Sequence, residues 1–324
     1  MIHRLAVPTP FRIGAVNCYL IDDDPLTLVD VGPNSGRSLA ALEDLLREHG
    51  RRVEDLERIV ISHQHTDHLG LVGVLADRSG ADVVALKELA PVVEAFGAHA
   101  DRDDELAQAL MLRHGITRDM VTALAAMSRA FRGWGGHAPV TTLLHDGGEL
   151  GFASRTFAVH HRPGHSPSDT VFFDARTGEL LAADHLLPRI SSNPLISQPL
   201  GGRSGEPGDG RPRALLMYME SLRATREMAV TRVYPGHGEE FGDHAALIDE
   251  RFEMHERRAE RILGLIAERP RSAHDIAQAI WGNVAVTQAY LTLSEVLGHV
   301  DLLLERGAVV EEELGGVIRF AAAG

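Results

Sequence analysis

The sequence is poor in several residue types, and each shortage excludes a class of protein. Cys18 is the only cysteine, so no disulfide framework can form within the chain, as is usual in a reducing cytoplasm. No apolar run approaches the roughly 18 residues that a membrane span needs. Met1 to Arg4 lead straight into strand-like sequence, so we expect no export signal. The chain is therefore predicted to be cytoplasmic, with no membrane partner.

Positive charge is also scarce. The chain has 32 Lys and Arg against 46 Asp and Glu, which gives a formal net charge of −14 at pH 7. Proteins that bind nucleic acid usually present a basic surface, so this balance disfavours a nucleic-acid partner without excluding a local basic groove. A small-molecule substrate is favoured instead. The sequence leaves the oligomeric state open, with a homodimer as one alternative.

The hydropathy pattern changes along the chain and indicates its organisation. The 324 residues are 44% hydrophobic, which is enough for a sizeable core. Strand-like runs, such as the apolar segment 58–61, are interrupted at about 87–134 by a stretch with helical periodicity. Near the end, helices precede two strands joined by Gly315-Gly316, a pattern typical of a winged-helix-like module. We predict one domain at 1–245, with a helical insertion, and a C-terminal region at 246–324.

The segment Ser62-His63-Gln64-His65-Thr66-Asp67-His68 carries four potential metal ligands directly after a predicted buried strand. In extended backbone, residues two apart face the same side, so His63 and His65 can reach one ion. The chain must then turn toward a helix, which brings Asp67 and His68 to another side. Imidazole and carboxylate ligands without thiolates suit zinc, manganese or iron. One short segment can therefore serve two neighbouring ions.

Three later positions complete the ligand set, and each lies at the end of a strand-like run. His165 sits in Pro-Gly-His-Ser, Asp184 follows the run 179–183, and His237 sits in Pro-Gly-His-Gly after the run 230–234. The Pro-Gly pair before each histidine favours a tight turn that aims the ring. Strand ends gathered at one edge of a sheet sandwich are a natural place to assemble a metal site.

This ordered set of motifs resembles the metallo-β-lactamase-fold hydrolase superfamily over about residues 10–245. The resemblance implies an α/β (α+β) fold, an αββα sandwich of two β-sheets with helices outside. It also implies two ligand groups that share one carboxylate. Carried over position by position, His63, His65 and His165 would bind the first ion, Asp67, His68 and His237 the second, and Asp184 both.

The resemblance also implies the chemistry. Two divalent ions, with zinc as the first choice and iron or manganese as alternatives, would lower the pKa of a bound water from about 15.7 to about 7. The hydroxide would attack a carbonyl or phosphoryl centre, and Asp67 would orient it while also binding metal. Asp30, in Val-Asp-Val-Gly, would support the ligands from behind. His185, Trp134 and Tyr218 are candidates for the substrate pocket.

The motifs indicate the substrate class less directly than they indicate the metal ligands. The motifs are similar to those of the glyoxalase II-like branch, which favours a thioester or ester of the hydroxyacylglutathione or acyl-CoA type. The chain's end does not resemble the glutathione-binding end of glyoxalase II. A C-terminal winged helix also resembles the layout of the lactamase-β-like protein 2 group, so an endoribonuclease is an alternative. A lactonase and a non-enzymatic sensor complete the hypotheses.

Overall fold

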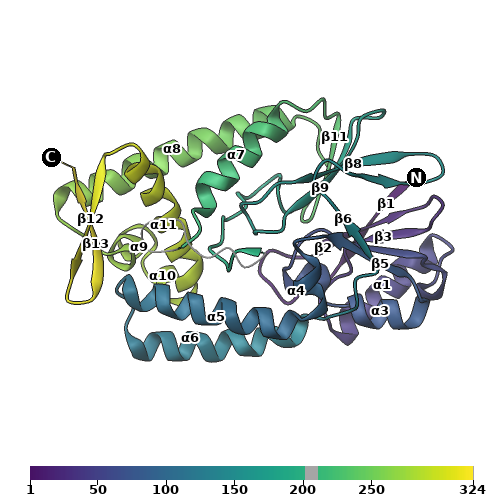
Figure 1. Cartoon of the computed structure of the whole chain (residues 1–324), viewed down its shortest axis with the longest axis horizontal. Helices are drawn as coiled ribbons and strands as arrows, with labels where there is room; N and C mark the ends of the chain where they lie inside the picture. Colours follow the sequence, from purple (N-terminus) through teal and green to yellow (C-terminus); the bar gives the residue numbers. More distant parts are fainter. Residues whose placement is uncertain (201–210, 324) are drawn as a thin grey trace. The chain divides into compact units, whose positions relative to one another are not determined.

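The computed structural model describes residues 1–200 and 211–323 (Figure 1). The contacts between residues divide the chain into two compact units. The first unit comprises Met1–Ala100, Phe131–Ser192 and Glu227–His244. The second comprises Asp101–Ala130, Asn193–Arg226 and Ala245–Gly324. Neither unit is one continuous stretch, because the chain passes from one to the other several times. The domain boundaries expected near residues 245, 87 and 134 stay predictions.

A six-stranded sheet of the first unit carries the N-terminal half of the motifs. Its strands, in spatial order, are β1 (Ile2–Val7), β2 (Val16–Ile21), β3 (Thr27–Val29), β4 (Arg58–Ile61), β5 (Asp82–Leu86) and β6 (Thr142–Leu144). The pairs from β1 to β3 are antiparallel, and those from β3 to β6 are parallel. Parallel strands are usually covered on both faces, which explains why Ile59, Val60 and Ile61 are all buried in β4.

A five-stranded sheet of the same unit carries the later motifs. Its strands, in spatial order, are β11 (Arg232–Pro235), β10 (Glu179–Ala183), β9 (Thr170–Asp174), β8 (Thr156–His161) and β7 (Glu149–Gly151). β10 and β11 are parallel and the other pairs are antiparallel. Because β10 and β11 run in the same direction, the residues that follow them emerge at the same edge of the sheet.

Short helices complete the first unit. They are α1 (Gly36–Glu48), η1 (Val53–Asp55), α2 (Thr66–Leu69), α3 (Val72–Ser79), α4 (Ala90–Glu94) and η2 (Arg132–Trp134). The Ser35 side chain caps α1 by accepting a hydrogen bond from the backbone N–H of Ser38. Leu42 and Leu46 form the buried face of α1, as amphipathic helical spacing requires.

The second unit is mainly helical. Its elements are α5 (Phe96–Arg113, which begins in the first unit), α6 (Arg118–Phe131, except Phe131), α7 (Ala214–Arg226), α8 (His244–Glu268, except His244), α9 (Ala273–Trp281), α10 (Val284–Thr287), α11 (Ala289–Glu305), β12 (Val309–Leu314) and β13 (Val317–Ala322). Ser272 and Asp275 form a capping box at the start of α9. The two strands expected around Gly315-Gly316 are confirmed, whereas the winged-helix assignment stays a prediction. Within the described ranges, no helix is long and apolar enough to cross a membrane.

Candidate metal centre

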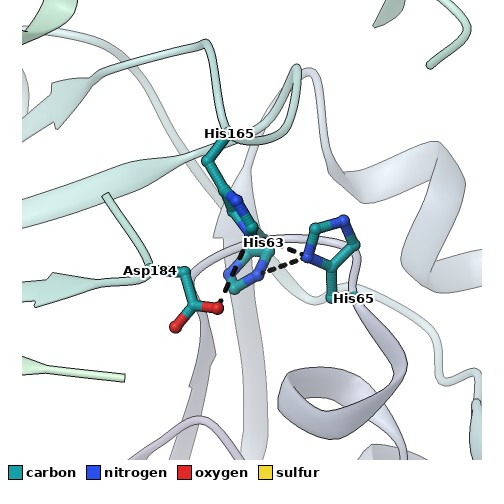
Figure 2. A group of neighbouring side chains, drawn as sticks. All are labelled: His63, His65, His165 and Asp184. Atoms are coloured by element: carbon teal, nitrogen blue, oxygen red, sulfur yellow. Dashed lines mark hydrogen bonds and ion pairs between the residues drawn. The ribbon is translucent and has the colours of Figure 1, made fainter. Parts of the chain in front are cut away.

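The loop after β4 delivers the first two imidazoles. β4 ends at Ile61, and residues 62–65 form the loop that leads to α2, which begins at Thr66. His63 is fully buried and His65 is half-buried. Nε2 of His63 lies 3.1 Å from Nδ1 of His65 (Figure 2). The two rings therefore present nitrogens to one point, as their spacing of two residues predicts.

Two side chains from the five-stranded sheet complete this first group. His165 follows β8 and Asp184 follows β10. Nε2 of His165 lies 2.9 Å from Nδ1 of His65 and 3.5 Å from Oδ2 of Asp184. One potential ligand atom from each of the four residues lies within 4.8 Å of the others. A single cation can thus be reached by three imidazoles and one carboxylate.

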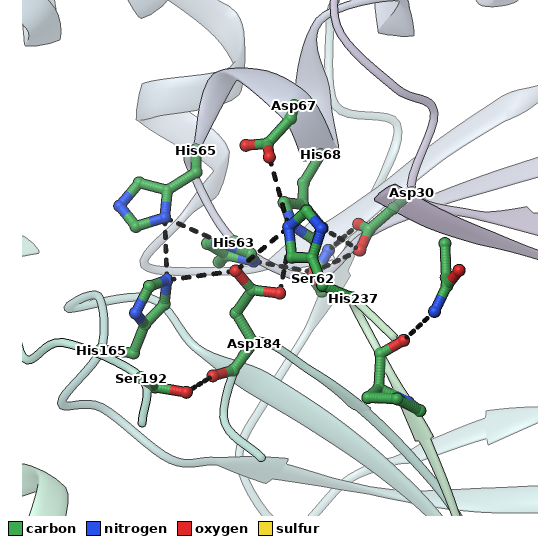
Figure 3. Close-up of polar contacts among 12 residues, drawn as sticks. Asp30, Ser62, His63, His65, Asp67, His68, His165, Asp184, Ser192 and His237 are labelled. Atoms are coloured by element: carbon green, nitrogen blue, oxygen red, sulfur yellow. Dashed lines mark hydrogen bonds and ion pairs between the residues drawn. The ribbon is translucent and has the colours of Figure 1, made fainter. Parts of the chain in front are cut away.

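A second group lies on the other side of Asp184. Asp67 and His68 come from α2, and His237 follows β11. Nε2 of His237 lies 3.3 Å from Oδ2 of Asp67. Asp184 faces this group as well, with Oδ1 3.3 Å from Nε2 of His68 and Oδ2 3.6 Å from Nε2 of His237 (Figure 3). The structure therefore brings the other six predicted ligands together around Asp184, which faces both groups.

The donor atoms fit divalent cations. Oδ1 of Asp184, Nε2 of His68 and Nε2 of His237 are buried and have no hydrogen-bond partner among the described residues. Buried polar atoms are normally satisfied, so three such atoms pointing into one space call for a further partner. Imidazole nitrogens and carboxylate oxygens without thiolates are the ligands that zinc, iron and manganese accept.

The electrostatics of the centre favour positive charge. Burial alone would raise the pKa of Asp184, but the neighbouring rings of His237 and His68 hold that pKa well below its usual range. Burial lowers the pKa of His68, yet Asp184 and Asp30 outweigh burial and raise it well above its usual value. Asp184 thus stays ionised and stabilises cationic charge on the neighbouring His68 ring. The same negative charge would stabilise a divalent cation bound among these side chains.

Asp30 holds the loop after β4 in place, as expected for a residue that supports the metal ligands. Its carboxylate accepts hydrogen bonds from the backbone N–H of Ser62 at 2.9 Å and from the Ser62 hydroxyl at 2.7 Å. Oδ2 also lies 2.7 Å from Nδ1 of His68. Ser62 Oγ is in turn 3.0 Å from Nδ1 of His63. Such contacts to the second ring nitrogen orient imidazoles and leave Nε2 to face a metal.

Strand β2 positions the loop that carries His237. The Asn17 side-chain amide donates to the backbone oxygens of Pro235 and Gly238, both at 2.8 Å. The Tyr19 hydroxyl also donates to Pro235 O, at 2.7 Å. Nδ1 of His237 is 2.8 Å from the backbone oxygen of Ala15, so Nε2 faces the cluster. The six-stranded sheet therefore holds a loop that belongs to the other sheet.

A buried polar network links the His165 loop to the first loop. Asp169 accepts from the backbone N–H of Ser166 at 2.9 Å and from its hydroxyl at 2.7 Å. The Ser168 hydroxyl donates to the Gln64 side-chain oxygen, and Thr170 N–H donates to Ser62 O at 3.1 Å. Burial raises the pKa of Asp169 to about 8, because the two hydrogen bonds from Ser166 only partly offset desolvation. The network holds the two loops in fixed positions relative to each other.

The backbone around Asp184 is tightly constrained. A Cβ atom at Gly236 would lie 2.1 Å from Oδ1 of Asp184 and 2.8 Å from Cε1 of His68. Ala183, directly before Asp184, has φ 43, a left-handed value that is uncommon for residues other than glycine. The Ser192 hydroxyl donates to the Asp184 backbone oxygen (Figure 3). Close approach and strain together aim the Asp184 carboxylate.

These supporting residues were missed by the sequence interpretation. Ser62, Gln64, Ser168 and Asp169 are common polar residues, and their roles depend on contacts between segments far apart in the chain. For Gly236, the Pro-Gly pair in the sequence predicted a tight turn. The close approach to Asp184, however, comes from a residue about fifty positions away.

The three predicted pocket residues have different surroundings. His185 is fully buried in the first unit, and burial lowers its pKa to about 3. Trp134 is half-buried and packs edge-on against Phe11, with ring centroids 5.3 Å apart. Tyr218 belongs to the second unit, where its ring meets that of His255 at 6.4 Å. Their roles as pocket residues stay predictions.

Comparisons with known proteins find similar sequences. Residues 12–237 match the family model described as the metallo-beta-lactamase superfamily. The probable metallo-hydrolase YqjP of Bacillus subtilis is 31% identical over 317 residues, which cover 98% of this chain and 96% of that protein.

Solved structures agree over almost the whole chain. A metallo-beta-lactamase family protein from Thermus thermophilus superposes with a TM-score of 0.80 at 25% identity, covering 99% of this chain and 98% of its own. A beta-lactamase domain protein from Burkholderia ambifaria gives 0.82 at 28% identity, covering 99% and 92%. The predicted fold class is confirmed.

Proposed function

This chain belongs to the metallo-beta-lactamase superfamily and is a metal-dependent hydrolase, and from that premise we propose that it uses two ions, preferably zinc, to hydrolyse an ester or thioester with an apolar acyl or aromatic group. The observation that carries the two-ion proposal is the position of Asp184, whose oxygens face His165 on one side and His68 and His237 on the other.

In this proposal His63, His65 and His165 hold one ion, Asp67, His68 and His237 hold the other, and Asp184 serves both. When bound, the ions act as Lewis acids and make water a stronger acid. Asp67 is buried, which would raise its pKa, yet the neighbouring rings of His237, at 3.3 Å, and of His68 keep that pKa lowered. Ionised at neutral pH, Asp67 can accept a hydrogen bond from the attacking water and orient it.

An aromatic cluster supports an apolar substrate group. Phe11, Phe131 and Trp134 pack together, with the Phe131 and Trp134 rings stacked at 5.1 Å. Phe131 remains 44% exposed, so this apolar surface is not fully used by the core. The Trp134 backbone oxygen would lie 2.3 Å from a Cβ at Gly70, the residue directly after α2. The cluster therefore adjoins the helix that carries Asp67 and His68.

The acidic composition supports a substrate without a polyanionic backbone, since phosphate recognition normally uses a basic surface. The single cysteine, which is buried, suits the cytoplasmic location that we propose.

A substrate screen with metal-loaded protein tests the proposal. The panel contains short and long acyl thioesters, aromatic esters, lactones, phosphodiesters and RNA. Wild type is compared with His65→Ala and with His145→Ala, a matched control at an exposed position. We expect His65→Ala to lose on the order of 10³-fold in kcat/KM, since metal stabilisation of the transition state is worth several kcal/mol. His145→Ala should match wild type.

The apolar part of the proposal has its own readout. Trp134→Ala should raise KM for long acyl thioesters and leave KM for the acetyl thioester nearly unchanged. A higher kcat/KM for RNA or phosphodiesters than for any thioester or ester would overturn the substrate assignment. Equal activity of wild type and His65→Ala would overturn the site itself.

A further inference from the structure

A third group of potential metal ligands lies in the second unit, apart in sequence from all the motifs above. His255 lies on α8, and Glu295 and His299 lie on α11. Nδ1 of His255 is 3.2 Å from Nε2 of His299. One potential ligand atom from each of the three residues lies within 4.8 Å of the others. Both histidines are fully buried, and the proposed hydrolytic mechanism uses none of the three.

We propose that His255, Glu295 and His299 bind one divalent transition-metal ion that links α8 to α11. Zinc–nitrogen bonds of about 2.0 to 2.1 Å at a tetrahedral angle place two ligand nitrogens roughly 3.3 Å apart. The observed separation of 3.2 Å between the imidazole nitrogens is close to that value. Glu295 and His299 are four residues apart, so they share one face of α11, while His255 comes from the other helix.

The surroundings of the ligands resemble the supporting contacts of a metal site. Nδ1 of His299 lies 2.7 Å from the backbone oxygen of Glu295 and donates to it, which leaves the lone pair on Nε2 to face His255. The Glu295 carboxylate accepts a hydrogen bond from the Arg258 guanidinium, which packs over the Trp281 ring at 5.4 Å. One ligand ring and the carboxylate are thus oriented by neighbouring groups.

The chemistry of the three side chains also suits metal binding. Two imidazole nitrogens and one carboxylate oxygen, without a thiolate, are ligands that zinc, iron and manganese accept. Because both rings are fully buried and come from packed helices, we assign a structural role to this ion and not a catalytic one.

Metal content per chain tests the proposal. Full-length protein is loaded with zinc, freed of excess by gel filtration and measured by elemental analysis. Wild type is compared with His255→Gln, Glu295→Gln and the matched control His114→Gln, which changes another fully buried histidine of the second unit. We expect His255→Gln and Glu295→Gln to hold one zinc fewer per chain than wild type, and the control to hold the same number.

Two further measurements keep the result decisive. Glu295→Gln changes volume little and is the deciding variant should His255→Gln fail to fold. In cobalt-loaded protein, the difference spectrum of wild type minus Glu295→Gln should contain visible bands of tetrahedral cobalt. Hydrolytic rates of Glu295→Gln should equal those of wild type, which separates this site from the hydrolytic centre. Equal metal content in wild type and folded Glu295→Gln, with a flat difference spectrum, would overturn the proposal.

Discussion

The two units both contain buried histidines beside a carboxylate, but they present them in opposite ways. In the first unit, His63, His165 and His237 lie on loops that follow strands, and hydrogen bonds from other segments hold those loops. In the second unit, His255 and His299 stand within long helices whose side-chain directions are set by the helical repeat.

The difference bears on function. A loop can bring ligands from distant strand ends to one point and leave a side open to substrate, but it needs supporting contacts such as those of Asp30. A helix pair needs less support because packing already orients the rings, yet it leaves little room for a reacting molecule. We therefore expect the first group to be sensitive to small backbone changes and the second to affect mainly stability.

The largest effect in this comparison is expected from Gly236→Ala. The new Cβ would lie 2.1 Å from Oδ1 of Asp184, so the carboxylate or the loop must shift. A displacement of about 1 Å in an active site can cost roughly 10²-fold. We expect such a loss in kcat/KM. Gly97→Ala, where nothing lies within 4 Å, is the control and should stay within about twofold of wild type. Equal rates for the two variants would contradict the close-approach argument.

A smaller effect is expected from Asp30→Asn. Asparagine tolerates the left-handed backbone at this position, where φ is 58, so the fold should persist. Loss of the charged acceptor for His68 should weaken zinc binding about tenfold, as is typical of residues that orient metal ligands. Competition with a chromophoric chelator measures the affinity. Asp44→Asn, at an exposed helix position, serves as control. Unchanged zinc affinity in Asp30→Asn would show that the contact of Asp30 with His68 does not contribute to metal binding.

The smallest expected effect is a change of stability with pH that arises from His255 in the second unit. His255 has a pKa of about 3 in the folded protein against an ordinary 6.5, so the unfolded chain binds more protons between these values. The stabilising contribution of the neutral ring is complete above pH 6.5 and is lost as pH falls from 6.5 toward 3. At pH 5.5 the loss is on the order of 1 kcal/mol.

Denaturant unfolding with a chelator present, at pH 7.5 and 5.5, checks this expectation. His255→Gln should lose less stability on acidification than wild type, while His145→Gln at an exposed position should behave as wild type. The same loss in His255→Gln and wild type would mean that the buried ring does not titrate as inferred.

Much of the hydrolytic centre could be predicted because its ligands carry strong local patterns. His63, His65, Asp67 and His68 lie within six residues, and a Pro-Gly turn precedes both His165 and His237. The strand Arg58–Ile61 and the C-terminal pair of strands also matched their predictions, since apolar runs and Gly-Gly turns are short-range signals.

By itself, the sequence determined which residue types could bind metal and where strands would present them, because periodicity and turn chemistry act over a few residues. Only the tertiary structure decided that Asp184 faces both ligand groups, that Asn17 and Tyr19 hold the His237 loop, and that His255 meets His299. These contacts join segments from 44 to more than 200 residues apart. Such pairs become neighbours only when two sheets or two helices pack, and no local pattern records that event.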